Sequence, residues 1–154
     1  MDDTKEINAA IERELTETGC MPPDLVVAMT IWGEAGSELV DVKRAVACVI
    51  YNRALSHSIT TGYPISVAAS EVCLAQHQFD CWLNGKFVHQ SPDESSDVWA
   101  ECVAAAKEIF LDSYAPFLVA NSYYIQRNSL RALRTKDMEC VGHVGGYAFY
   151  LEKG

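Results

Sequence analysis

The sequence predicts one α+β domain that is mostly helical and carries a small β element near its C-terminus. Apolar residues recur at helical spacing in several segments, most regularly over residues 37–55 and 97–114. Near the end of the chain, residues 141–151 instead fit two short strands that turn at Gly145-Gly146. The length of 154 residues suits a single domain, and no internal repeat or long linker divides the chain.

Five helices are expected from the apolar periods and from the residues that begin and end them. They span residues 4–18, 25–35, 37–55, 66–74 and 97–114. Asp24 and Ser37 precede the second and third helices as N-caps, and Gly36 closes the second. The remaining segments are expected to be a polar loop over 56–65, an irregular stretch over 76–96, an extended segment over 117–125 and a basic loop over 127–138.

The chain is acidic, with a formal net charge of −9 and a pI near 4.8. This charge argues against a nucleic-acid partner, because proteins that bind nucleic acid present a basic face. The longest apolar stretch, Leu25–Trp32, is too short to span a bilayer, so no membrane insertion is expected. The acidic start of the chain lacks the pattern of a secretory signal, so we expect synthesis in the cytoplasm without a signal peptide. A local basic groove is still compatible with the uneven placement of Lys43, Arg44, Arg53, Arg127, Arg131, Arg134 and Lys136.

The six cysteines are expected to be reduced thiols, because the chain shows no secretory signal. Cys73, His77 and Cys81 recur at i, i+4 and i+8, and on one continuous helix they would share a face that could hold zinc. Alternatively, Cys73 ends a helix and the other two residues lie in the loop after it. No fourth ligand is evident nearby, so no metal site is expected.

Glu34 is the candidate for chemistry that the helical spacing singles out. Val27, Ile31, Glu34 and Glu38 recur at i, i+4, i+7 and i+11, so Glu34 extends an apolar face. Burial and the negative end of the helix dipole both raise the pKa of a carboxyl in this position. A carboxyl that stays protonated near neutral pH can act as a general acid. The alternative is an ordinary surface glutamate at a helix end.

Four short motifs lie in order along the chain. They are Glu34-Ala35-Gly36-Ser37-Glu38, the helical set Ala45, Val46, Ala47, Val49, Asn52 and Arg53, the set Gln78, Phe79, Cys81 and Trp82, and the pair Tyr123-Tyr124. With these motifs the chain, from Leu25 to Tyr150, resembles the SleB/CwlJ-like cell wall hydrolases, which include spore cortex-lytic enzymes and some phage endolysins. Two positions depart from the family pattern, since Gly36 stands where the family has Arg and Tyr147 where it has His. The nearest histidine, His143, lies four residues upstream of Tyr147.

The resemblance implies a lysozyme-like fold, with a catalytic domain over residues 21–154 and an N-terminal helix in residues 1–20 outside it. It also implies cleavage of the β-1,4 bond between N-acetylmuramic acid (MurNAc) and N-acetylglucosamine (GlcNAc), as a lytic transglycosylase that forms 1,6-anhydro-MurNAc. This reaction needs one essential carboxyl, because the C6 hydroxyl of the muramoyl residue is the nucleophile. Glu34 is the expected catalytic acid, and no cofactor is expected. The residues that the resemblance implies in substrate binding are Glu38, Gln78, Phe79, Trp82, Tyr123, Tyr124 and Tyr147.

Several other functions remain open from the sequence. A muramidase would hydrolyse the same bond, and a lysozyme-like wall-binding or virion protein would keep the fold without activity. A zinc amidase would need metal ligands, and no two of His57, His77, His89 and His143 make a convincing pair. The expected setting is phage-type host lysis by a monomer that reaches the periplasm or wall with a holin-type export partner. A secretion-system effector or a bacterial housekeeping enzyme is also compatible with the sequence.

Overall fold

The computed structural model describes residues 21–75, 78–83, 86–125 and 138–152, and these form an α+β fold that is mostly helical, as predicted. The helices are α2 (Pro23–Ala35), α3 (Val40–Thr61), α4 (Ile65–Leu74) and α5 (Asp97–Glu108). The strands are β1 (Trp82–Leu83), β2 (Lys86–Phe87), β3 (Ser122–Ile125), β4 (Met138–Val144) and β5 (Tyr147–Glu152). The helix expected over 4–18 and nearly all of the basic loop expected over 127–138 lie outside the described residues.

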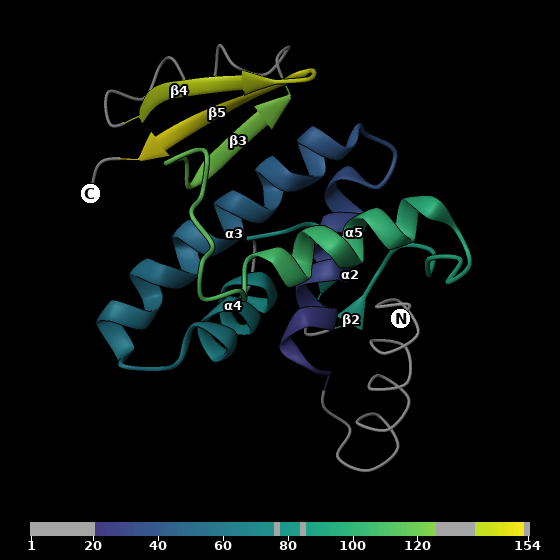
Figure 1. Ribbon diagram of the computed structural model, residues 1–154, viewed down its shortest axis with the longest axis horizontal. Helices are drawn as coiled ribbons and strands as arrows, with labels where there is room; N and C mark the ends of the chain where they lie inside the picture. The colour runs from purple at the N-terminus through teal and green to yellow at the C-terminus, as the bar shows by residue number, and fades with distance from the viewer. Residues whose placement is uncertain (1–20, 76–77, 84–85, 126–137, 153–154) are drawn as a thin grey trace.

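Helix α3 separates the two parts of the fold (Figure 1). On one side it packs against α2, α4 and α5, and on the other it contacts β3 and β4 of the three-stranded sheet. Val27 and Ile31 of α2 and Val46 and Ile50 of α3 are fully buried in the same apolar core. The sequence-based expectation that the helix after Glu38 lies at the centre of the domain is therefore confirmed.

The C-terminal sheet has the strand order β3-β5-β4, with antiparallel neighbours throughout. Its β4–β5 turn contains Gly145 at φ 58°, a left-handed conformation that glycine adopts without strain, so the predicted turn at Gly145-Gly146 is confirmed. Phe149 of β5 is fully buried against Ala45 and Val49 of α3. This contact fixes the sheet on α3 and, through the pairing of Tyr123 with Phe149, sets the position of β3.

Two predicted boundaries of α3 are wrong. The helix begins at Val40, not at Ser37, and it continues to Thr61 through the first half of the expected loop over 56–65. The hydroxyl groups of Thr60 and Thr61 donate to backbone carbonyls four residues earlier, so these exposed polar side chains find partners within the last turn of the helix. Gly62, at φ 79°, then ends α3 as a left-handed C-cap.

Smaller corrections concern the other helix ends. Asp24 lies in the first turn of α2 and does not cap it, because Pro22 occupies the N-cap position. Helix α4 begins at Ile65 after Pro64, one residue before the expected cap. Helix α5 stops at Glu108, and only residues 122–125 of the expected extended segment form a strand. Within the described part of the chain, none of the helices has the length and apolar character needed to cross a bilayer.

Candidate active site

Glu34 lies in the last turn of α2, where the core ends. Its side chain is partly buried, and the hydroxyl of Tyr123 on β3 donates a hydrogen bond to its Oε1 over 2.6 Å. Asp80 and His89, from the loops on either side of the β1–β2 hairpin, are close enough to interact with the carboxyl electrostatically. Glu34 therefore extends the apolar face of α2, as the helical spacing predicted, and it lies at the border between the core and solvent.

Burial raises the pKa of Glu34, and Asp80 adds to this effect because a second negative charge disfavours ionisation. The hydrogen bond from Tyr123 and the positive charges of His89 and Arg53 oppose the rise without cancelling it. The same burial raises the pKa of Tyr123 well above its ordinary value, and the Glu34 carboxylate acts in the same direction. Tyr123 therefore keeps its proton and serves as the donor to Glu34.

A second tyrosine–glutamate contact lies beside the first. Tyr147 of β5 donates to Oε1 of Glu38 at 3.5 Å, the long end of the hydrogen-bond range. The rings of Tyr123 and Tyr147 meet edge to face with their centroids 5.9 Å apart. The structure therefore brings together four of the residues that the sequence nominated: Glu34, Glu38, Tyr123 and Tyr147.

Asn52 and Arg53 of α3 hold the segment that leads into β3. The side-chain amide of Asn52 donates to the carbonyl oxygens of Leu118 and Ala120 at 2.8 and 2.9 Å. Nε of Arg53 donates to the carbonyl oxygen of Asn121 at 2.6 Å. These bonds fix the backbone up to two residues before Tyr123. Asn52 and Arg53 therefore help to position Tyr123, the residue that donates a hydrogen bond to Glu34.

The Gln78–Trp82 motif follows α4 and lies against α2 and α3. Gln78 is exposed and accepts from Nη1 of Arg53 at 3.4 Å, while Phe79 is buried beneath the Arg53 guanidinium. Trp82 is also buried, and its indole N–H donates to Oγ1 of Thr30 at 2.8 Å. Because Phe79 and Trp82 are buried, their rings are not open to a sugar, and they contribute to the packing under the site. Tyr124 lies on β3, but its side chain is outside the described part.

A groove of about 540 Å³ opens directly on Glu34. Its walls come from the end of α2 and from the loop before α5, including Trp32, His89, Gln90 and Asp93. The indole N–H of Trp32 donates to the carbonyl oxygen of Gln90 at 3.1 Å, which joins the two walls. Sequence analysis did not nominate Trp32, His89 or Asp93. Trp32 stands two residues before Glu34 in the sequence, and this proximity was an available signal, whereas the positions of the other two residues depend on the fold of a loop.

Helix α4 ends at Leu74, so Cys73 lies at the end of a helix and Cys81 is not on that helix, which agrees with the alternative reading of the Cys73, His77 and Cys81 spacing. Cys73 is buried at the end of α4 and Cys81 is buried before β1, while His77 lies outside the described residues. Burial raises the pKa of the Cys73 thiol to about 12 and that of Cys81 further still, which disfavours the thiolate that binds metal. Among the residues that the structure describes, no three side chains form a metal-binding group.

Two other residues considered in the sequence analysis, Lys43 and His143, do not line the groove at Glu34. Lys43 is not part of a basic groove, because it is buried and donates to the carbonyl oxygen of Glu38 at 2.8 Å and to Oε1 of Glu101 at 2.7 Å. His143 lies exposed on β4, where its Nε2 is 3.6 Å from Sγ of Cys140. It is not among the groups that interact with Glu34.

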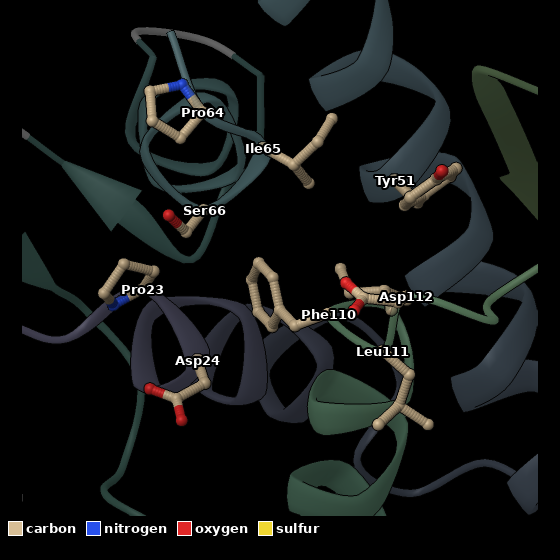
Figure 2. Close-up of a pocket in the computed structure, with 10 residues that line it drawn as sticks. Pro23, Asp24, Tyr51, Pro64, Ile65, Ser66, Phe110, Leu111 and Asp112 are labelled. Carbon is tan, nitrogen blue, oxygen red and sulfur yellow. The ribbon is translucent and has the colours of Figure 1, made fainter.

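A separate cavity of about 640 Å³ lies at the opposite end of α2 from Glu34 (Figure 2). Pro23 and Asp24 of α2, Pro64 and Ser66 at the start of α4, and Phe110 after α5 line it. Its acidic side chains, Asp24 and Asp112, lie at separate points of the rim. Among its lining residues no acid is seen hydrogen-bonded to a second titratable group, unlike Glu34 with Tyr123 in the groove.

The fold and this groove define a protein with a partly buried carboxyl at the end of α2, which accepts a hydrogen bond from a tyrosine hydroxyl and faces an open groove. The chain belongs to the cell wall hydrolase family: the family model described as Cell Wall Hydrolase matches residues 37–150, about three quarters of the chain. Enzymes of this family act on peptidoglycan. The match begins three residues after Glu34, so it includes Glu38, Asn52, Arg53 and the tyrosines but not the acid itself. No curated protein and no solved structure matches the chain, and the lysozyme-like fold therefore stays a prediction.

Proposed function

We propose that the protein is a lytic transglycosylase that cleaves the β-1,4 bond between MurNAc and GlcNAc, with Glu34 as its acid and base. The observation that carries the proposal is the Glu34 carboxyl itself, buried enough to raise its pKa and open to a groove on one side. An acid with this environment stays protonated at a pH where an exposed glutamate is ionised.

In the proposed reaction Glu34 donates its proton to the glycosidic oxygen, which leaves with GlcNAc as the bond from C1 of MurNAc breaks. The C6 hydroxyl of the same MurNAc attacks C1 and closes the 1,6-anhydro ring, and its proton returns to Glu34. Because the nucleophile is part of the substrate, the step needs no activated water and no second carboxylate. Tyr123 would stabilise the carboxylate form of Glu34 between the two proton transfers through its 2.6 Å hydrogen bond.

The muramidase alternative is favoured by one observation, the position of Asp93 in the same groove. The backbone N–H and the hydroxyl of Ser95 donate to Oδ1 of Asp93 at 3.0 and 2.8 Å, and these bonds lower the pKa of its carboxyl. An ionised carboxylate in the groove is the group that a hydrolase uses as nucleophile or base. In that case water would add to C1, and the new end would be reducing MurNAc.

Mass spectrometry of digested peptidoglycan separates these reactions. The transglycosylase gives anhydro-MurNAc ends that carry no oxygen from ¹⁸O-labelled water, whereas the muramidase gives reducing ends that carry the label. Glu34→Gln should lower activity by about 10²–10⁴-fold in either case, since it removes the general acid. A wild-type protein that binds peptidoglycan and releases neither product would favour the non-catalytic wall-binding alternative. Full activity in the presence of a strong chelator would contradict a zinc amidase.

Phage-type host lysis is the biological setting that we propose for this activity. Co-expression with a pore-forming holin should then lyse bacterial cells, and the Glu34→Gln variant should not. Lysis by the Glu34→Gln variant at the wild-type rate would contradict a role for this acid.

A further inference from the structure

A third hollow, a pocket of about 470 Å³ that mixes polar and apolar side chains, lies between the C-terminal half of α3 and the end of α4. The two helices pack against each other, and Figure 1 shows α4 beside this part of α3. Residues one helical turn apart on α3, Arg53 and His57, line one wall, and Glu71 of α4 and its C-cap residue Ala75 line the other. Gln78 and Asn121 also line the pocket.

The pocket and the groove share no lining residue, but a short segment connects them. Arg53 and Asn121 both line the pocket, and Nε of Arg53 donates to the Asn121 carbonyl, while Tyr123, two residues further along the chain, donates to Glu34 in the groove. A polymer bound at Glu34 can extend along this segment toward the pocket. This is the arrangement that an enzyme needs when it binds its polymer on more than one side of the bond that it breaks.

The chemistry of the two hollows differs. The groove offers the indole of Trp32, an apolar surface suited to a sugar face. Within the described residues the pocket has no Trp, Tyr or Phe in its lining, and it offers guanidinium, imidazole, amide and hydroxyl groups instead. Such groups suit peptide amides and carboxylates.

The charge in the pocket favours an anion at Arg53. Glu71 already has a partner, because its Oε2 lies 3.1 Å from Nε2 of His57. The Arg53 guanidinium carries five N–H groups. Its bonds to described residues use Nε and Nη1, toward the Asn121 carbonyl and Gln78. Donors on the guanidinium therefore remain for a carboxylate, in a protein whose net charge of −9 would otherwise repel one.

We propose that this pocket binds the stem peptide carried by the muramoyl residue, with Arg53 as the partner of a peptide carboxylate. The inference rests on the proposed function, because it takes the substrate to be peptidoglycan. A volume of about 470 Å³ is within the usual range of small-ligand pockets and accommodates the first residues of a peptide. The enzyme would then recognise the muramoyl side of the bond by its peptide and the sugar chain by the groove.

The first experiment fills the pocket and compares two substrates. Ala75→Trp places a large side chain at an exposed position of the pocket wall, and Ala104→Trp, at an exposed position of α5, is the matched control. The measured quantity is the ratio of kcat/KM for peptide-bearing glycan to kcat/KM for glycan from which an amidase has removed the peptides. Ala75→Trp should lower this ratio about tenfold, and Ala104→Trp should leave it at the wild-type value. An unchanged ratio in Ala75→Trp would overturn the inference.

The second experiment does not depend on catalysis. Muramyl dipeptide is titrated into the ¹⁵N-labelled Glu34→Gln protein, and the side-chain amide signals of Gln78 and Asn121 are followed by NMR. These signals should move with muramyl dipeptide and not with the GlcNAc trimer, and Ala75→Trp should remove the response. Shifts with the trimer alone would overturn the peptide site. If the wild-type protein cleaves neither glycan while the dipeptide still binds, the proposed function fails and the peptide site stands.

Discussion

The hydroxyl of Tyr123 and Oε1 of Glu34 are 2.6 Å apart, although 89 positions separate the two residues in the chain. Glu34 is placed by α2, and Tyr123 is placed by β3, which Asn52 and Arg53 fasten to α3. The contact opposes the effect of burial on Glu34, because a hydrogen bond donated to a carboxylate favours its charged form. Burial is the largest cause of the raised pKa of Glu34, and the tyrosine limits how far it rises.

Tyr123→Phe tests this balance. Removing the hydroxyl removes a contact that lowers the pKa of Glu34, so the pKa should rise further above its ordinary value. The acid then stays protonated to a higher pH, and the basic limb of the kcat/KM profile should move to higher pH. The loss of one hydrogen bond should also lower the maximal rate by up to about tenfold. Tyr147→Phe is the control, since Tyr147 contacts Glu38, and a basic limb that moves to lower pH in Tyr123→Phe would contradict the assignment.

Glu34→Gln should make the protein more stable at neutral pH while it removes activity. The folded-state pKa of Glu34 is raised by burial, so wild-type stability from this group is fully present below the ordinary glutamate pKa and is lost as pH rises through the folded-state value. Glutamine does not ionise and still accepts the hydrogen bond from Tyr123. The difference in Tm between Glu34→Gln and wild type should therefore grow as the pH rises from the ordinary glutamate pKa through the raised folded-state value. Glu94→Gln, at an exposed loop position, is the control, and a difference that shrinks with pH would contradict the prediction.

The elements that sequence analysis placed best are those whose pattern is local. The apolar period of α2 predicted that Glu34 lies in its last turn and extends its apolar face, and Gly145-Gly146 predicted the β4–β5 turn. The end of α3 was missed for an equally local reason. Residues 56–61 are polar like a loop, but their threonine hydroxyls bond back to the helix and an exposed helix needs no apolar face there.

The support of the site was less predictable, because it depends on contacts between distant segments. Nothing near Phe79 or Trp82 distinguishes an aromatic that meets a sugar from one that fills the core, and the fold covers both. Lys43 has the sequence pattern of a surface cation, yet it is buried because the Glu38 carbonyl and Glu101 accept from it. The groove wall that contains His89 and Asp93 comes from a loop whose path has no periodic signal.

Gly33→Ala tests the close approach of α2 to the segment before β1. A Cβ atom at position 33 would lie 2.5 Å from Cβ of Cys81 and 3.2 Å from the Phe87 ring, so the hairpin would have to move. Overpacking of this kind should lower the free energy of unfolding by about 1–3 kcal/mol. Denaturant unfolding measures it, with Gly146→Ala as the control because a Cβ there meets no atom within 4 Å. Equal stability of the two variants would show that the segment before β1 adapts without cost.

Lys43→Met tests whether a buried cation holds the turn that follows the acid. Lys43 is 1% exposed, and its ammonium group joins the Glu38 carbonyl to Glu101 of α5. Methionine fills the same space without a donor, which leaves the carbonyl and the carboxylate without their partner. Hydrogen bonds to a charged group contribute about 1.5–3 kcal/mol, and we expect the lower end because the Glu101 side chain is 42% exposed and regains water.

Arg44→Met is the matched control from the next position, since its pair with Glu108 is exposed on both sides and its loss should cost no more than about 1 kcal/mol of stability. If Lys43 positions the turn, Lys43→Met should also lower kcat at a temperature where the variant is fully folded, and Arg44→Met should not. Equal losses of stability in the two variants, with kcat unchanged in both, would contradict a role of Lys43 in positioning the turn and would leave it as an ordinary ion pair between α3 and α5.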